Sequence, residues 1–314
     1  MPTGIEHPGI LLCGHLDVIE HPNGDVYRSV IHEGRIYGPG AGDMKGQLAI
    51  MLELFQNLHR QHPGISLGLA ITSDEERGGE CGVRFLVEDL GLRCGLAIIP
   101  DGGSLNDITI EEKGILHLSV RSHGHSSHAA RPWLADNPLL RLTEGLVRLQ
   151  EYFDRLKPAD LASEDHWYPT CANTIVHTPN ETINRIPSEA EAALDVRFPP
   201  PHTIEEMLQT VRSVLGDDLQ VDCIVGAEAT HLDPDPEFLE WTERITGQPA
   251  KLVKASGGSD GRFLCNHDIP VLLSRPLVGN LHAENEWIDI QSMETYFRIC
   301  HAFIEAKLVQ STSF

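Results

Sequence analysis

The sequence predicts an α/β protein with a mostly parallel sheet, interrupted by an inserted α+β module. Three observations support this expectation. Short apolar runs alternate with amphipathic stretches in the first third of the chain, the pattern changes near residue 114, and helical and strand patterns resume after a proline-punctuated stretch at 233–236. The 314 residues are also too many for one ordinary core. We therefore expect a catalytic domain formed by residues 1–113 and 231–314, with residues 114–230 inserted between its two parts.

The first part of the chain predicts strands and helices in alternation. The expected elements are strand 10–13, helix 47–59, strand 65–71, helix 81–90 and strand 96–99. A histidine or an acid follows each of these strands, namely His15, Glu76 and Asp101. Open α/β sheets carry their functional sites at the carboxyl ends of the strands, so we expect these side chains to share one site.

The inserted stretch predicts a different order of elements. The expected elements are strand 115–121, helix 137–156, strands 174–176 and 190–198, helix 204–215 and strand 219–225. This βαββαβ order is that of a split βαβ, or ferredoxin-like, module. The module contains no obvious set of metal ligands, so the metal chemistry is expected in the catalytic domain.

Composition and charge exclude several classes of partner. The net charge of −22 argues against nucleic acids and anionic membranes. No apolar run has the length of a transmembrane span, and the N-terminal residues lack the pattern of a signal peptide. The seven cysteines are scattered without a CxxC pair, as expected for reduced thiols. These features predict a cytoplasmic protein.

Five acid and histidine side chains in ordered, glycine-rich surroundings carry the predicted chemistry. They are His15 in GHLD, Asp43 in GPGAGDMKG, Glu76 in DEE, Asp101 in PDGG and His282 in HAENE. Two imidazoles and three carboxylates suit two divalent ions that share one carboxylate. Such a pair activates water and polarises a carbonyl, which predicts a two-metal amide hydrolase. Zinc is the expected metal, although these ligand types also suit cobalt and manganese.

Two further acids fit this chemistry. Asp17 can accept the second ring N–H of His15 and fix its tautomer. Glu75, beside the presumed ligand Glu76, can move the proton of the reacting water. Each motif alone also has a plain structural interpretation: a core histidine, a helix N-cap for Asp43, or a solvated acidic turn at 74–76.

The ordered set HxD, GxxDMKG, DEE, PDG and a distant HxxxE resembles the di-zinc amidohydrolases of metallopeptidase family 20. That family includes carboxypeptidase G, aminoacylase, acetylornithine deacetylase and succinyl-diaminopimelate desuccinylase. The resemblance runs from about Gly9 to the C-terminus. It implies a phosphorylase/hydrolase-like catalytic domain, a lid and dimerisation domain at 114–230, and a homodimer.

The resemblance also implies roles for the ligand residues. Asp43 would bridge both ions, and a cis peptide bond would follow it at Asp43–Met44. One ion would be completed by His15 and Asp101, and the other by Glu76 and His282. Glu75 would be the general base.

More positions in the inserted module match the family. The resemblance implies that His128 reaches the partner subunit's site and stabilises the oxyanion, with His125 as the competing assignment. Asn184 and Arg197 would hold the substrate carboxylate, since an arginine fork suits that task. A surface ion pair with Asp195 is the alternative role for Arg197.

The GGSD segment resembles a family loop that lines the substrate pocket, which implies substrate-binding roles for Gly258 and Ser259. The expected function is hydrolysis of the amide of an N-acyl amino acid or a small peptide with a free carboxylate. An alternative is a catalytically silent, dimerising or metal-binding relative, because family members carry a longer segment before the HxD strand. A two-metal phosphoesterase has suitable metal chemistry but lacks matching motifs elsewhere.

Overall fold

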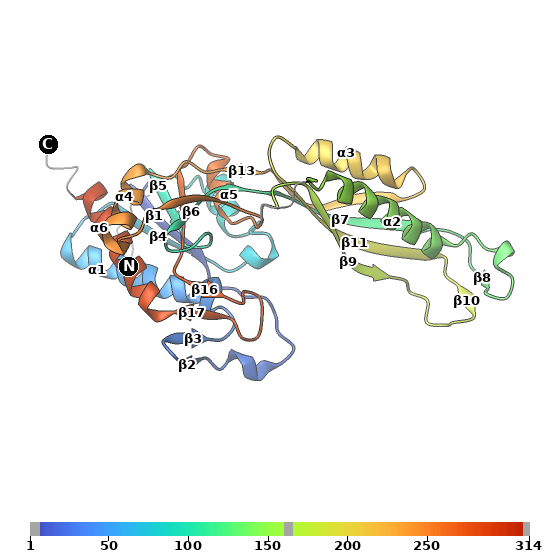
Figure 1. The fold of residues 1–314 in the computed structure, drawn as a ribbon, viewed down its shortest axis with the longest axis horizontal. Helices are drawn as coiled ribbons and strands as arrows, with labels where there is room; N and C mark the ends of the chain where they lie inside the picture. The colour runs from blue at the N-terminus through green and yellow to red at the C-terminus, as the bar shows by residue number, and fades with distance from the viewer. Residues whose placement is uncertain (1–6, 160–165, 310–314) are drawn as a thin grey trace. The chain divides into compact units, whose positions relative to one another are not determined.

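The computed structural model describes residues 7–159 and 166–309. The chain divides into two compact units (Figure 1). Unit 1 contains the described residues up to Glu111, His231–Ala255 and those from Ser259 onward, and unit 2 contains Glu112–Thr230 and Ser256–Gly258. The chain therefore leaves unit 1 after its first third and returns to it near residue 231.

Unit 1 is built on a seven-stranded mixed sheet with the order β13-β6-β15-β5-β1-β4, and β14 pairs with β6. Strands β4, β1, β5 and β15 are parallel to one another, whereas β6 is antiparallel to β15. The strands are β1 (Ile10–His15), β4 (Leu67–Thr72), β5 (Leu96–Ile99), β6 (Asp107–Glu112), β13 (Thr230–His231), β14 (Lys251–Ala255) and β15 (Val271–Leu273). The predicted mostly parallel sheet is confirmed.

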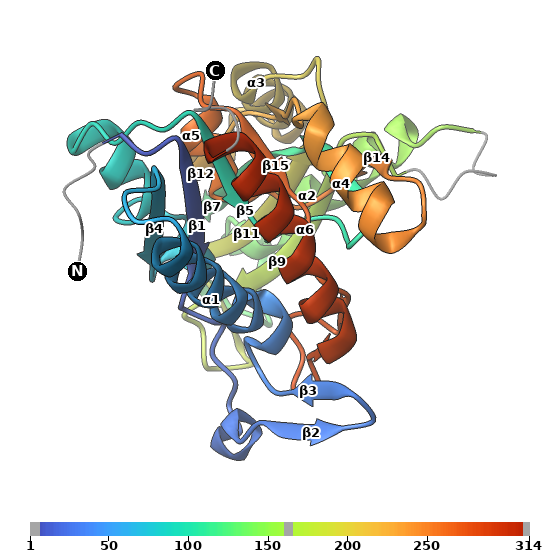
Figure 2. The ribbon, with the colours of Figure 1, turned by 90° about the vertical axis from the view of Figure 1, so that its left-hand side faces the viewer.

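Helices cover both faces of this sheet. The helices of unit 1 are α1 (Gly46–Gln61), α4 (Pro236–Thr246), α5 (Gly261–Cys265) and α6 (Ile290–Leu308). Leu12 of β1 packs in a core with residues of α1, α4 and α6, which lie in front of the sheet in Figure 2. Its neighbours Leu11 and Cys13 point to the opposite face and pack with residues of α5. The continuous burial of β1 follows from this double cover.

A second, small sheet in unit 1 was not predicted. It joins β16 (Val278–Gly279), β17 (Trp287–Asp289), β3 (Arg35–Tyr37) and β2 (Val30–His32) in that order, with antiparallel pairing throughout. Its strands have two or three residues and are largely exposed or half-buried. Such short strands have no readable hydrophobic alternation, which explains why the sequence did not reveal them.

Unit 2 has the predicted βαββαβ order. Its four-stranded antiparallel sheet has the order β12-β7-β11-β9. The elements are β7 (Gly114–His123), α2 (Pro138–Leu156), β9 (Thr170–His177), β11 (Glu189–Phe198), α3 (Ile204–Leu215) and β12 (Gln220–Ala227), with a two-residue pair formed by β8 (Ser127–His128) and β10 (Arg185–Ile186). Alternate residues of β11 are buried against α2 and α3, so the other face of the sheet is open.

One predicted helix is much shorter than expected. The stretch 81–90 contains only a helical turn at Phe85–Asp89. Gly78 and Gly79 before it have φ values of 106° and 69°, which interrupt the chain where a helix would begin. The other short helical turns are Gly24–Tyr27, Ala41–Lys45, Glu75–Arg77 and Pro132–Leu134. Within the described residues, no helix combines the length and the apolar character needed to cross a membrane.

Candidate metal centre

The parallel strands of unit 1 deliver several predicted residues to one edge of the sheet. His15 is the last residue of β1, Glu75 and Glu76 follow β4, and Asp101 follows β5. Because β4, β1 and β5 are adjacent and parallel, their carboxyl ends meet at the same edge. The topology alone therefore brings these four side chains together.

The small sheet positions the other two predicted ligands, Asp43 and His282. Asp43 lies in the helical turn that follows β3, and His282 lies in the loop between β16 and β17. Residue Trp287 of β17 pairs with Tyr37 of β3, so these two segments are joined although they are far apart in the sequence. The structure thus places all five predicted ligands in one region of unit 1.

The carboxylate of Asp43 lies between the two histidines. Its Oδ1 is 3.0 Å from Nε2 of His15, and its Oδ2 is 3.2 Å from Nε2 of His282. His282 Nε2 is also 3.4 Å from Oε2 of Glu76. Ligand atoms of His15, Asp43 and Asp101 lie within 4.8 Å of one another, as do those of Asp43, Glu76 and His282. Asp43 belongs to both groups.

This donor set fits two divalent ions. Zinc bonds to histidine nitrogen and carboxylate oxygen are about 2.0–2.2 Å long, so the ligand atoms of one tetrahedral ion lie about 3.4 Å apart. The distances around Asp43 are of that size, and each group contains one histidine and two carboxylates. The Asp43–Met44 peptide bond is cis, as the family resemblance implied.

Asp17 holds His15 from the other side of its ring. The Nδ1 atom of His15 lies 3.1 Å from the backbone oxygen of Asp17 and 3.4 Å from its Oδ1. The Oδ2 atom of Asp17 accepts the backbone N–H of Glu76 at 3.1 Å. These contacts leave Nε2 of His15 directed toward Asp43, which is the orienting role expected for a group behind a ligand.

The electrostatics of this region favour added positive charge. Burial lowers the pKa of His15, but its hydrogen bond to Asp43 and the charge of Asp101 outweigh this and raise it to about 10. Hydrogen bonds to Asp43 and Glu76 raise the pKa of His282 to about 10. Burial, together with the charge of Asp43, raises the pKa of Asp101 well above its ordinary value. Without a cation, the two histidines would retain protons near neutral pH, and a metal ion would replace these protons.

Glu75 has the properties of a base working near neutral pH. Burial and then the negative charge of Asp260 raise its pKa to about 7. Asp260 is only 4% exposed, and its Oδ1 has no hydrogen-bond partner among the described residues. A carboxylate whose pKa is close to the working pH can both accept and release a proton.

The sequence did not assign a role to Arg275 or to Glu286. Arg275 stands two residues after the last residue of β15, as Asp101 does after β5, so the strand-end rule that found Asp101 would also have found it. Glu286 stands in the same HAENE segment as His282, but its burial could not be read from the sequence. Arg275 lies beside Asp101, and Glu286 accepts the backbone N–H of Asp43.

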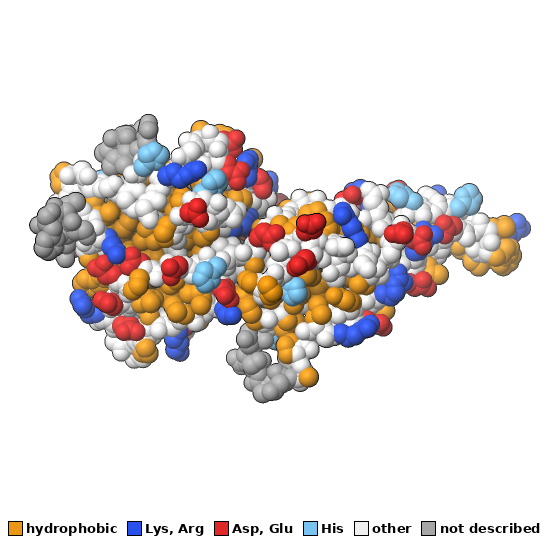
Figure 3. Space-filling model, turned by 90° about the horizontal axis from the view of Figure 1, so that it is seen from above, with side chains coloured by type: hydrophobic (Ala, Val, Ile, Leu, Met, Phe, Trp, Pro, Cys, Tyr) orange, Lys and Arg blue, Asp and Glu red, His pale blue; other side chains and the backbone are white. Residues whose placement is uncertain are grey.

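Unit 2 places His128 and Asn184 next to each other. His128 is in β8, opposite Arg185 of β10, and the backbone oxygen of Asn184 accepts the N–H of Ala129. The Nδ1 atom of His128 accepts the N–H of Ala130 at 3.0 Å, which leaves Nε2 available. Hydrophobic side chains gather at this end of the unit (Figure 3), where Trp133 is 76% exposed.

Arg197 lies far from His128 within unit 2. In the register of β11 and β7, Glu189 is opposite His123 near one end, whereas Arg197 is opposite Ile115 near the other. Arg197 is eight positions further along the strand than Glu189, a distance of about 26 Å. A single copy of unit 2 therefore does not bring His128 and Arg197 to the same small substrate.

The guanidinium of Arg197 forms an ion pair with the neighbouring Asp195. Its Nε and a terminal nitrogen donate to the two carboxylate oxygens of Asp195 at 2.6 and 2.9 Å. This is the ion pair that the sequence left open as an alternative. The second terminal nitrogen of the guanidinium keeps its two N–H donors outside this pair.

The GGSD segment places its two predicted residues differently. Gly258 is half-buried, whereas Ser259 is 1% exposed and its hydroxyl accepts the N–H of Gly261. The Ser259 side chain therefore shapes the start of α5, and Gly258 is the more accessible of the two.

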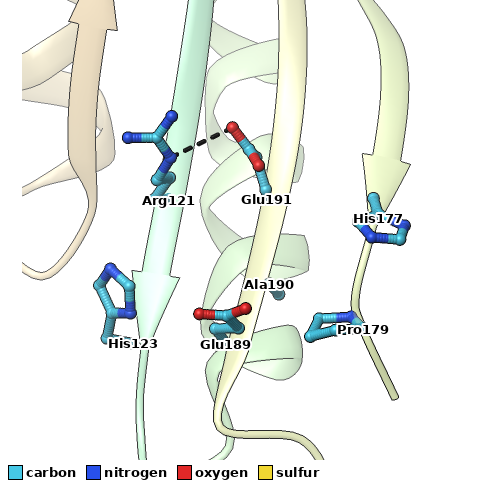
Figure 4. Close-up of a pocket in the computed structure, with 7 residues that line it drawn as sticks. All are labelled: Arg121, His123, His177, Pro179, Glu189, Ala190 and Glu191. Carbon is cyan, nitrogen blue, oxygen red and sulfur yellow. Dashed lines mark hydrogen bonds and ion pairs between the residues drawn. The ribbon is translucent and has the colours of Figure 1, made fainter. Parts of the chain in front are cut away.

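A separate pocket lies on the open face of the unit 2 sheet (Figure 4). It has a volume of about 260 Å³ and includes an ion pair of 3.2 Å between Arg121 and Glu191. His123 and His177 lie on either side of Glu189 in this view. The pocket contains none of the predicted site residues, and among the described residues it forms no metal-ligand group.

Fold and site together define a metal-dependent hydrolase with an inserted domain. Residues 11–306 match the model of peptidase family M20/M25/M40, and the chain belongs to this family of metallopeptidases and amidohydrolases. It is 30% identical to a succinyl-diaminopimelate desuccinylase of Thioalkalivibrio sulfidiphilus, over 98% of this chain and 86% of the relative. The corresponding protein of Granulibacter bethesdensis is 29% identical, over 95% and 82%.

Solved structures show the same fold. A tripeptidase from Staphylococcus aureus matches with a TM-score of 0.76 and 19% identity, covering 98% of this chain and 83% of that one. An M20 family metallo-carboxypeptidase from Sulfolobus solfataricus also matches with a TM-score of 0.76, at 17% identity, covering 96% and 85%. The predicted family and fold class are confirmed.

Proposed function

We propose that the protein is a two-metal hydrolase that cleaves the amide bond of an N-acyl amino acid or small peptide with a free carboxylate. The observation that carries this proposal is the position of Asp43, whose two oxygens each face one histidine at 3.0 and 3.2 Å. His15 and Asp101 would hold one ion, Glu76 and His282 the other, and Asp43 both. Zinc fits these ligands, and cobalt or manganese would also be accepted.

The bound ions would polarise the scissile carbonyl and lower the pKa of water. Glu75 takes one proton from the water as the water oxygen attacks the carbonyl carbon. Glu75 then gives this proton to the amide nitrogen as the carbon–nitrogen bond breaks. The products are an amine and a carboxylic acid, and the acid loses its remaining proton to solvent to become a carboxylate. The raised pKa of Glu75 suits both transfers.

We infer that the enzyme works as a homodimer through unit 2, acting as a lid and dimerisation domain. The separation of His128 and Arg197 within one unit supports this, because a second copy can supply the group that one copy holds too far away. Arg197 and Asn184 would bind the substrate carboxylate, Gly258 would line the pocket, and His128 would stabilise the oxyanion. A cytoplasmic location is part of the same proposal.

A substrate panel tests the proposed function. Purified protein is loaded with zinc, cobalt or manganese and assayed against N-succinyl, N-acetyl and N-benzoyl amino acids and against di- and tripeptides. We expect metal-dependent release of free amine from at least one class, and loss of that activity with a chelator. Two bound ions per chain without turnover of any amide would contradict the proposal.

A further inference from the structure

The carboxylate of Glu286 is buried against the backbone of Gly42 and Asp43. Its Oε1 accepts the N–H of Gly42 at 2.6 Å and the N–H of Asp43 at 2.8 Å. Glu286 is 2% exposed, and its own backbone oxygen accepts the N–H of Gly38 at 2.9 Å. Side chain and backbone of this one residue therefore bind the glycine-rich loop that carries Asp43.

The fit between the two segments is close. A Cβ atom on Gly42 would lie 2.9 Å from Cβ of Val278 and 3.0 Å from the backbone oxygen of Trp287. A Cβ atom on Gly46 would lie 2.7 Å from a methyl group of Ile288. The glycine-rich loop thus packs directly on the segment around β16 and β17, which also carries His282.

The loop that presents His282 needs support. His282 has a φ of 61°, a left-handed conformation that costs energy for a residue with a side chain. Its side chain is 52% exposed, so packing around the ring contributes little to its position. Glu286 is four residues further on and closes this loop with a hydrogen bond from its N–H to the oxygen of Ala283.

We propose that Glu286 is a positioning residue for the metal centre, which fastens the loop of Asp43 to the loop of His282. This inference rests on the proposed two-metal site. The two N–H groups that Glu286 binds belong to the turn that precedes α1, where backbone donors have no partner within the helix. A negative acceptor satisfies them and fixes the backbone of Asp43 within reach of His282. Groups behind metal ligands typically change metal affinity by about 10- to 100-fold when they are removed.

The test compares Glu286→Ala, which removes the acceptor oxygen, with Glu284→Ala. Glu284 is in the same loop, is exposed and has no hydrogen bond among those of the described residues, so it is a matched control. Zinc binding to the metal-free chain is measured by calorimetry at a temperature where circular dichroism shows each variant folded. The melting temperature of the metal-free protein is recorded separately. Glu286→Asp, which keeps the charge but shortens the side chain, is measured in parallel.

We expect Glu286→Ala to weaken zinc binding by about 10- to 100-fold, with Glu284→Ala within about twofold of the unchanged chain. Glu286→Asp should fall between them. Unchanged zinc affinity in Glu286→Ala, with or without a lower melting temperature, would overturn the positioning role while leaving the proposed metal centre intact. If the unchanged chain binds no zinc, the proposed function fails first, and the positioning role fails with it.

Discussion

The guanidinium of Arg275 lies 3.6 Å from the carboxylate of Asp101, at the carboxyl ends of the neighbouring parallel strands β15 and β5. The Arg275 side chain is 16% exposed, and its Nε has no hydrogen-bond partner among the described residues. The distance to Asp101 is too long for a hydrogen bond, so the interaction is mainly one of charge. Arg275 therefore offsets part of the negative charge that Asp43, Asp101 and Glu75 bring together.

Replacement of Arg275 by methionine should separate metal binding from turnover. Removal of the positive charge makes the site more attractive to cations, so we expect zinc to bind at least as tightly as before. The same change leaves Asp101 a stronger electron donor to its ion, and kcat should fall by up to about tenfold, which corresponds to about 1.4 kcal/mol. Arg275→Lys should keep most of kcat. Zinc titration and steady-state kinetics on the three proteins measure both effects, and weaker zinc binding in Arg275→Met would contradict the charge argument.

The strand-end rule explains how much of the site could be predicted from the sequence. His15, Glu76 and Asp101 each follow an apolar run, and parallel strands bring such positions together whatever the details of packing. Hydrophobic periodicity predicted the βαββαβ module, because its long strands and helices show it clearly.

Long-range contacts formed by short elements could not be predicted. The small sheet that joins β3 to β17 consists of strands of two or three residues, and no local pattern indicates that Tyr37 pairs with Trp287. The burial of Glu286 depends on such contacts, whereas Arg275 follows a strand of the main sheet. Glutamate and arginine are most often exposed, so their types alone predicted surface positions.

The metal-free protein should lose stability as the pH rises. The folded-state pKa values of His15 and His282 are raised from 6.5 to about 10, so their favourable contribution is complete below pH 6.5 and is lost as the pH rises toward 10. The raised pKa of Glu75, about 7, acts in the same direction. The lowered pKa of Asp43 acts oppositely and matters only in acid.

Melting temperatures of the metal-free protein between pH 5 and 10 test this expectation. We expect a decline above about pH 6.5 that zinc reverses, since the ions take the place of the protons. A melting temperature that rises steadily to pH 10 without metal would show that these side chains do not retain protons.

Glu75→Gln should leave both ions bound and reduce kcat by about 10²- to 10⁴-fold, because the amide cannot accept the proton of the reacting water. Asp260→Asn is the companion variant. Loss of the Asp260 charge lowers the pKa of Glu75, and the acid limb of the profile of kcat/KM against pH should move to lower pH. Metal analysis and pH–rate profiles provide the measurements. Turnover at the normal rate in Glu75→Gln would exclude Glu75 as the base.

Arg197→Met should raise KM by about 10- to 100-fold with little change in kcat, because a charge-assisted hydrogen bond to a substrate carboxylate contributes about 1.5–3 kcal/mol. Arg121→Met is the matched control. Like Arg197, Arg121 lies on the open face of the unit 2 sheet, in strand β7. It forms ion pairs with Glu191 and Asp222 at 3.2 Å, but it is not a predicted substrate residue. Equal effects of the two substitutions on KM would assign Arg197 to the ion pair with Asp195 alone.

Mixing two inactive variants tests whether His128 acts on the partner's site. Glu75→Gln removes the base from its own site, and His128→Ala removes the oxyanion donor from the site that it serves. If His128 acts on the partner's site, one of the two sites in a mixed dimer contains both Glu75 and His128. Random exchange makes about half of the dimers mixed, so about one quarter of the unaltered activity should return. Subunit exchange is followed by mass spectrometry while activity is assayed. If mixed dimers form and remain inactive, His128 serves its own chain's site or none.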